Sequence, residues 1–226
     1  MSADASGESA AGAAAARSVG ARPCGGMKIL PWFWELVFHG ALLLMRLRLK
    51  TEWRGLEKAP SGAVVLAAKH GSSWDIPLMS RLARRALGRR AYFQMGSFIG
   101  YPVLGPLVPL LRRCGGFCVM RPKEILRLRR RGSSRDALHA LMDRVNREAT
   151  ETRRAVLETG GVLVFFPEGS RDATQVLPLK ADREITTAVD LRFEGVASTL
   201  WPIVLSYGSK RRWRRRRVIV EALDPF

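Results

Sequence analysis

Cysteine is scarce in this chain: among 226 residues there are only Cys24, Cys114 and Cys118. Three cysteines cannot provide a disulfide framework, which excludes the class of small disulfide-stabilised domains. Cys114 and Cys118 are not accompanied by a second pair of Cys or His residues, so no bound metal is expected. The default environment for such a chain is a reducing cytosol.

Acidic residues are also few, with 20 Asp and Glu against 38 Lys and Arg, and the net charge is +18. An excess of this size predicts an anionic partner, which could be nucleic acid, anionic lipid or an acidic protein. Most of the basic residues are arginine, whose planar guanidinium suits bidentate contact with phosphate. The length predicts one domain with appendages, large enough for a sizeable core.

The start of the chain lacks apolar bulk. Residues 1–27 are rich in Ala, Gly and Ser and contain no aromatic side chain, so we interpret them as a disordered N-terminal extension. A secretory signal peptide is not indicated, because the small residues precede the apolar segment instead of following it.

No apolar run reaches the length that clearly predicts a membrane span. The most apolar segment, residues 29–45, falls short of the roughly 20 residues that cross a bilayer. Glu35 and His39 within it are costly in hydrocarbon, whereas its tryptophans suit the interface and the basic residues after it suit anionic headgroups. We predict a membrane-associating helix over residues 28–50, on the cytoplasmic face. A spanning helix and a helix packed on the domain core are the alternatives.

What the chain does contain is a histidine and a carboxylate placed after a buried strand. The apolar run 63–68 predicts the strand, and the periodic run 76–87 predicts an amphipathic helix. Between them lies His70-Gly-Ser-Ser-Trp-Asp75. Ser72 or Ser73 can cap the helix, so that Asp75 in its first turn reaches back to the imidazole. A histidine oriented in this way is a general base; the alternative is a capped helix with an incidental histidine.

A second motif follows a second strand-like apolar run, residues 161–165. It reads Phe166-Pro-Glu-Gly-Ser-Arg171. The glycine permits a tight turn, and an arginine beside exposed backbone donors suits a phosphate group.

Together these two stretches resemble the glycerolipid (lysophospholipid) acyltransferase family, whose signature is His-x-x-x-x-Asp followed by Glu-Gly-Thr-Arg; here Ser170 stands in place of the threonine. Two weaker blocks are present in the same order. Residues 115–121 are similar to the Gly-x-x-x-x-x-Arg block, and residues 201–204 are similar to the late apolar block that contains proline. The resemblance covers roughly residues 53–226.

The resemblance implies an O-acyltransferase with His70 and Asp75 as the catalytic pair. It implies substrate binding by a set of residues around the other motifs: Arg121, Glu168, Gly169, Ser170 and Arg171. The acceptor would be a lysophospholipid, and the donor a thioester of coenzyme A or acyl carrier protein. No metal or bound cofactor is implied, because the thioester is a co-substrate.

The remaining pattern alternates strands and helices, which predicts an α/β fold with a mixed sheet flanked by helices. The acyltransferase domain is expected over residues 51–226, with a basic helical insertion around 122–159 whose partner is anionic lipid or acyl carrier protein, if it is not simply solvated. Other strand candidates are 91–95, 116–120, 200–207 and 218–222, and other helix candidates are 133–157 and 186–193.

Basic residues surround Trp213 over 210–217. Such a cluster can bind nucleic acid or an anionic membrane surface, and we favour the membrane. The expected reaction is acylation of 1-acylglycerol-3-phosphate to phosphatidate. Lyso-ornithine lipid and glycerol 3-phosphate are alternative acceptors. A non-catalytic protein that binds membranes or nucleic acid is the alternative outside the enzymes.

Overall fold

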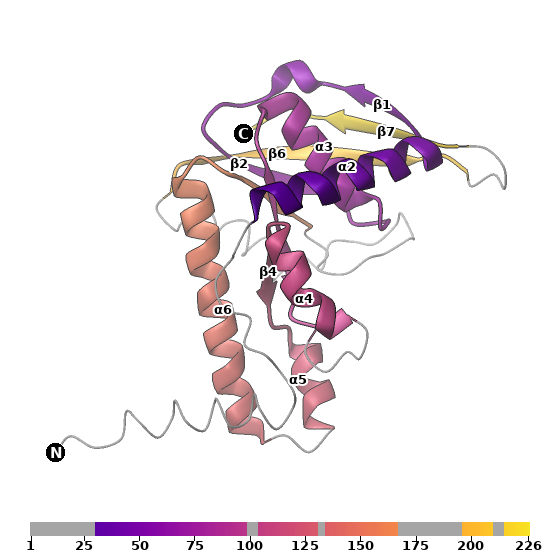
Figure 1. Cartoon of the computed structure of the whole chain (residues 1–226). Coiled ribbons are helices and arrows are strands. Elements are labelled where there is room, and N and C mark those ends of the chain that lie inside the picture. Colours follow the sequence, from indigo (N-terminus) through magenta and orange to yellow (C-terminus); the bar gives the residue numbers. More distant parts are fainter. Residues whose placement is uncertain (1–29, 99–103, 131–133, 167–195, 210–214) are drawn as a thin grey trace. The chain divides into compact units, whose positions relative to one another are not determined.

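The computed structural model describes residues 30–98, 104–130, 134–166, 196–209 and 215–226 (Figure 1). Over these residues the chain forms a seven-stranded mixed sheet, in the order β1-β7-β6-β2-β5-β3-β4, with helices beside it. The predicted α/β fold class is therefore confirmed. The strands are β1 (Leu49–Arg54), β2 (Ala63–Ala68), β3 (Ala91–Gly96), β4 (Gly116–Val119), β5 (Val162–Phe165), β6 (Ser198–Tyr207) and β7 (Arg216–Ala222). The helices are α2 (Pro31–Arg48), the short 3-10 helix η1 (Leu56–Lys58), α3 (Asp75–Leu87), α4 (Leu104–Arg113), α5 (Pro122–Arg129) and α6 (Arg135–Glu158).

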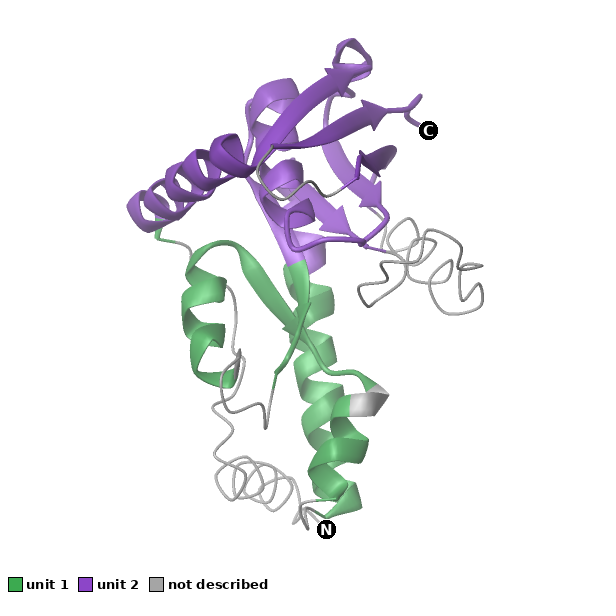
Figure 2. Ribbon diagram, turned by 90° about the vertical axis from the view of Figure 1, so that its right-hand side faces the viewer, with its two compact units in different colours: residues 1–30, 94–152 green, residues 31–93, 153–226 purple. Residues whose placement is uncertain are grey.

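The chain divides into two compact units, coloured separately in Figure 2. The larger unit contains residues 31–93 and 153–226, and the smaller contains residues 1–30 and 94–152. Both β3 and α6 begin in one unit and end in the other. The histidine motif and the start of the second motif belong to the larger unit.

The larger unit is built around β2, which is paired in parallel with β5 on one side and β6 on the other. Its residues are apolar on both faces and almost all buried, as expected for a strand inside a parallel sheet. β7 runs antiparallel to β6, and β1 parallel to β7. Leu78, Met79 and Leu82 of α3 are fully buried in the same core. Each contributes on the order of 1.5–3 kcal/mol, which fixes α3 and therefore its first residue, Asp75.

The smaller unit has its own core between α4, α5, β4 and the first part of α6. α6 contributes Leu138, Leu141 and Val145 to it, at the spacing of three and four residues that places side chains on one face of a helix. The helix predicted over 133–157 is thus present. A separate helix, α5, precedes it within the region predicted as a helical insertion.

The start of α3 differs from the sequence prediction. The N-cap position is occupied by Trp74, which makes no side-chain cap hydrogen bond, so the prediction that Ser72 or Ser73 is the capping residue is wrong. The Ser72 hydroxyl instead accepts a hydrogen bond from the Trp74 backbone N–H at 3.3 Å. The Asp75 carboxylate also accepts the Ser72 backbone N–H, which holds the backbone of Ser72 in the turn before the helix.

α2 has two apolar faces with different surroundings. Trp34, Phe38 and Met45 are buried, and the helix packs against α3 and β1 of the same unit. The rest of the helix surface carries large exposed side chains, of which Trp32, Leu36, Leu43 and Leu47 lie opposite the buried face at 100° per residue: Trp32, Leu36, Val37, Leu43, Leu44 and Leu47. Among the described residues, no helix is both long and apolar enough to span a bilayer. The helix predicted at 186–193 lies outside the described residues.

The turn after β1 requires a glycine, and this gives a first prediction. Gly55 has φ +69°, and a Cβ there would meet the backbone carbonyl of Ala222 at the end of β7. Gly55→Ala should lower the free energy of unfolding by about 3 kcal/mol or more, because a left-handed backbone and a clash with main-chain atoms add together. Chemical denaturation measures the effect.

Gly62→Ala is the matched control, because Gly62 has φ +74° but open space around its Cβ position. It should cost only about 1–2 kcal/mol, the penalty for the left-handed conformation. Equal losses for the two variants would show that the close approach of Ala222 is unimportant.

Candidate active site

His70 and Asp75 are brought together by the strand–turn–helix in which they lie. His70 follows the end of β2, and Asp75 is the first residue of α3. The His70 Nδ1 and the Asp75 Oδ2 are 2.9 Å apart. The predicted contact between imidazole and carboxylate is therefore present, although the role of the pair in catalysis stays a prediction.

The Asp75 carboxylate is completely buried, while the His70 side chain keeps 16% of its surface exposed. A buried carboxylate needs hydrogen-bond donors to replace water, and Asp75 has three from the described residues. Its Oδ2 accepts the Ser72 backbone N–H at 2.7 Å in addition to the imidazole. Its Oδ1 accepts the hydroxyl of Tyr207. Hydrogen bonds therefore hold both oxygens of the carboxylate in place. The carboxylate in turn holds the His70 ring with its Nδ1 edge toward Asp75.

Phe166 contacts the other partner of the pair. Its ring stacks on the His70 imidazole with 4.4 Å between centroids and 25° between planes. The contact arises because β5 pairs in parallel with β2, with Phe165 opposite Ala67. The residues that leave these two strands therefore leave at the same edge of the sheet, where open α/β sheets bind ligands.

The Tyr207 hydroxyl lies in an environment that keeps it protonated. Burial raises the pKa of Tyr207 above its ordinary value, and the hydrogen bond to the Asp75 carboxylate, together with the charge of that carboxylate, raises it further. A protonated phenol is a hydrogen-bond donor. Tyr207 therefore remains a donor to Asp75 over the whole physiological pH range.

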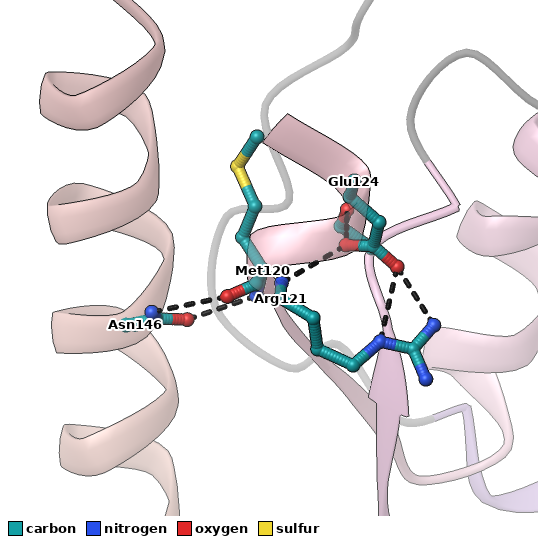
Figure 3. A network of polar contacts seen from close by, with 5 residues as sticks. Met120, Arg121, Glu124 and Asn146 are labelled. Atoms are coloured by element: carbon teal, nitrogen blue, oxygen red, sulfur yellow. Dashed lines mark hydrogen bonds and ion pairs between the residues drawn. The ribbon is translucent and has the colours of Figure 1, made fainter. Parts of the chain in front are cut away.

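Arg121, predicted as a substrate-binding residue, belongs to the smaller unit and is paired there with Glu124 (Figure 3). Its Nε and Nη2 lie 3.3 and 2.8 Å from the Glu124 Oε1. Glu124 is buried, and its Oε2 also accepts the Arg121 backbone N–H and the Ser97 hydroxyl. The guanidinium is thus neutralised by an adjacent carboxylate, which reduces the net charge that the pair offers to a phosphate.

The backbone just before Arg121 is fixed by α6. The Asn146 side chain accepts the Met120 N–H at 2.8 Å and donates to the Met120 carbonyl at 3.2 Å (Figure 3). A side-chain amide that pairs with both backbone groups of one residue imitates a strand neighbour. It holds the end of the block that contains Arg121.

The other predicted substrate-binding residues, Glu168, Gly169, Ser170 and Arg171, lie outside the described residues. Over the described ranges, no group of three or more His, Cys, Asp or Glu side chains is arranged to hold a metal ion.

Comparison with known proteins places this arrangement in a family. The family described as "Acyltransferase" matches residues 50–205, a range that includes the histidine pair, the second motif and most of the sheet. The chain belongs to the acyltransferase family. This confirms the family recognised from the four sequence blocks.

A solved structure similar to this acyltransferase is the 1-acyl-sn-glycerophosphate (LPA) acyltransferase PlsC from Thermotoga maritima. The two share 16% sequence identity, with a TM-score of 0.47, over 85% of this chain and 68% of that one. At this similarity the substrate of that enzyme is not transferred to this chain. No curated protein sequence gave a significant match.

Sequence reasoning missed two contacts of the pair in this acyltransferase. Phe166 was noted only as the start of the second motif, and Tyr207 only as the end of a strand. Tyr207 lies 132 residues from Asp75, and no local pattern connects them. The one available signal was a tyrosine near the end of an otherwise apolar strand, a side chain whose hydroxyl needs a partner when it is buried.

The three donors around Asp75 give a second prediction. Asp75→Ala leaves the Ser72 N–H, the imidazole and the Tyr207 hydroxyl without their acceptor. The free energy of unfolding should fall by about 1–3 kcal/mol, the cost of unsatisfied buried polar groups. Thermal and chemical denaturation at neutral pH measure the loss.

Asp75→Asn is the control of the same shape. Its amide oxygen can still accept from the Ser72 N–H and the imidazole, and the Tyr207 hydroxyl can turn to accept from its NH2 group. Its loss of stability should be the smaller of the two. If the two variants lost the same free energy of unfolding, the stability of the site would depend on the negative charge of Asp75 and not on the number of its hydrogen bonds.

Proposed function

We propose that this acyltransferase transfers a fatty acyl group from a thioester to the free hydroxyl of a lysophospholipid. The proposed acceptor is 1-acylglycerol-3-phosphate, and the product is phosphatidate. The observation that carries the proposal is the His70–Asp75 contact of 2.9 Å with a fully buried carboxylate. A histidine held in this way has the properties of a general base for a hydroxyl nucleophile.

The chemistry follows from the orientation of the imidazole. With Nδ1–H donated to Asp75, the neutral ring presents Nε2 as the base. Nε2 takes the acceptor hydroxyl proton while the hydroxyl oxygen attacks the thioester carbonyl, and Asp75 stabilises the imidazolium that forms. The tetrahedral intermediate then releases the thiolate, which receives the proton from Nε2. An acyl-enzyme is not needed, because the acceptor is itself the nucleophile and the thioester is already activated.

The exposure of the two side chains agrees with these roles. The carboxylate that orients the base is closed off from water, whereas His70 retains an exposed fraction through which an acceptor can approach. Stacking on Phe166 holds the plane of the ring. A base with a fixed ring and a fixed tautomer loses little entropy when the acceptor binds.

The acceptor phosphate is assigned to arginines. We propose that Arg171 binds it and that Arg121 assists, with Glu168, Gly169 and Ser170 positioning the acceptor. Because Arg121 is paired with the buried Glu124, Arg171 should supply the larger part of the phosphate binding. The donor is acyl-CoA or acyl carrier protein, used as a co-substrate, and no bound cofactor takes part.

The same function requires access to lipid, and we propose that α2 provides it at the cytoplasmic face of an anionic membrane. Its exposed face carries six large apolar side chains, and Arg46, Arg48 and Lys50 are exposed beside it. Apolar burial together with basic residues near headgroups is the pattern of an interfacial helix. The buried face of α2, packed on α3 and β1, would keep the catalytic pair close to the bilayer surface.

The reaction is tested by thioester consumption in detergent. Wild-type protein is supplied with oleoyl-CoA or acyl carrier protein thioester and with lysophosphatidate, lyso-ornithine lipid or glycerol 3-phosphate. We expect turnover with lysophosphatidate, and His70→Ala should lower it by about 100-fold or more, the scale expected for loss of a general base. His139→Ala, an exposed histidine on α6, is the control and should leave turnover unchanged.

If only lyso-ornithine lipid or glycerol 3-phosphate is acylated, the proposed general-base mechanism stands and the proposed acceptor is wrong. If no acceptor reacts, or if His70→Ala is as active as wild type, the proposed mechanism is wrong. RNA binding that depends on Trp213, without acyl transfer, would then indicate a binding protein.

The membrane surface is tested by vesicle sedimentation with phosphatidylglycerol in the vesicles. Replacing Leu43 and Leu47 together by serine should weaken vesicle binding about tenfold or more, because the variant no longer transfers the apolar surface of two leucine side chains from water into lipid. A matched double substitution of Val204 and Leu223 by serine, exposed apolar residues that lie outside α2 and outside the 122–159 region, should leave binding unchanged. Equal losses in the two double variants would contradict the assignment to α2.

A further inference from the structure

The longest strand of the larger unit extends beyond the strand that carries the histidine. β6 contains 10 residues and β2 contains 6. In their parallel pairing the last residue of β2, Ala68, lies opposite Ile203. β6 then continues to Tyr207, paired in this part with β7. The end of β6 is thus carried past the end of β2, to the turn where His70 and Asp75 lie.

Tyr207 meets Asp75 on the oxygen that the histidine does not use. Its hydroxyl donates to Oδ1, whereas the imidazole and the Ser72 N–H share Oδ2. With donors on both oxygens, rotation of the carboxylate about its Cβ–Cγ bond would break at least one hydrogen bond in a buried place, which is costly. The contact with Tyr207 therefore selects one orientation of the carboxylate.

The tyrosine is itself held from two sides. The Ser72 side chain is a further hydrogen-bond partner of its hydroxyl, and the hydroxyl proton itself is donated to the Asp75 carboxylate, which can only accept. The Arg216 guanidinium lies over the phenol ring, 4.6 Å from its centre, and its Nε donates to the Gly208 carbonyl at 2.6 Å. A cation over the face of a ring is attracted by the ring electrons, so Arg216 fixes the plane of the ring.

We propose that Tyr207 is a positioning residue of this acyltransferase, which holds the Asp75 carboxylate in the orientation that receives the His70 Nδ1 proton. Its effect on the reaction rests on the proposed function of His70 as the base. Tyr207 touches neither the acceptor nor the thioester in the proposed reaction, and acts only through Asp75.

The hydrogen bond from Tyr207 also reduces the negative charge that the Asp75 carboxylate presents to the imidazole. A donor on Oδ1 withdraws part of the negative charge of the carboxylate. Without it, Asp75 would stabilise the imidazolium more strongly, and a larger fraction of the base would be protonated at a given pH. Ser72 and Phe166, which contact the pair, are uncharged, and the cation Arg216 lies over the Tyr207 ring.

Tyr207→Phe tests the proposal, because it removes the hydroxyl and keeps the ring that packs in the core and contacts Arg216. We expect kcat to fall about tenfold, the size of a hydrogen bond to a charged group, with KM for both substrates changed by less than about twofold. The acid limb of the pH–rate profile should move to higher pH. Tyr92→Phe on β3 is the control, because Tyr92 is not among the described residues that donate to Asp75.

A second measurement needs no substrate. A proton shared between Nδ1 and a buried carboxylate exchanges slowly with water and gives a low-field proton NMR resonance. The chain has three histidines, and His39 and His139 are exposed, so only His70 should give this resonance. It should move or broaden in Tyr207→Phe and stay in place in Tyr92→Phe.

The outcomes separate the two proposals. An inactive wild type whose resonance moves in Tyr207→Phe would refute the acyl transfer and keep the positioning role. Unchanged kcat, acid limb and resonance in Tyr207→Phe would overturn that role. A lower kcat with the acid limb and the resonance unmoved would also overturn it, because a purely structural contribution of the hydroxyl predicts that pattern.

Discussion

A carboxylate that is closed off from water must be surrounded by donors, and the site depends on how Asp75 meets this requirement. The donors come from separate parts of the larger unit: the turn after β2, which provides His70 and Ser72, and the end of β6, which provides Tyr207. Each donor supplies a hydrogen bond that the buried carboxylate needs, and the same hydrogen bond holds the donor in its position. The pairing of β2 with β6 and the start of α3 therefore have to be correct together for the histidine to be oriented.

The elements that carry the pair, β2 and α3, are themselves part of the core of the larger unit. Leu78, Met79 and Leu82 anchor α3 on the sheet, and the apolar residues of β2 hold the strand before His70. Packing of this kind contributes far more free energy than the polar contacts of the site, whose net value is about 1 kcal/mol each. Burial supplies the stability of the unit, and the hydrogen bonds use that rigid frame to fix the direction of two side chains.

Charge is handled differently in different parts of the chain. In the smaller unit, Glu124 is buried against Arg121, so an arginine inside a family block is compensated by its own neighbour. In the last turn of α2, by contrast, Arg46 and Arg48 are exposed to solvent. The net charge of +18 therefore does not identify by itself which arginines can bind a phosphate or a headgroup, because a nearby carboxylate removes the effect of any one of them.

The sequence by itself determined the fold class, the family and the closeness of His70 to Asp75, because these follow from local periodicity and from spacing within one strand–turn–helix. It also located most strands and helices to within a few residues. Only the tertiary structure decided that Tyr207 reaches Asp75, that Phe166 stacks on His70 and that one face of α2 is buried while the other is exposed. These contacts depend on which strands pair and in which register, and the partners are far apart along the chain. The missing serine cap on α3 has a related cause: Ser72 is held by the turn around Asp75, and local propensity does not include that constraint.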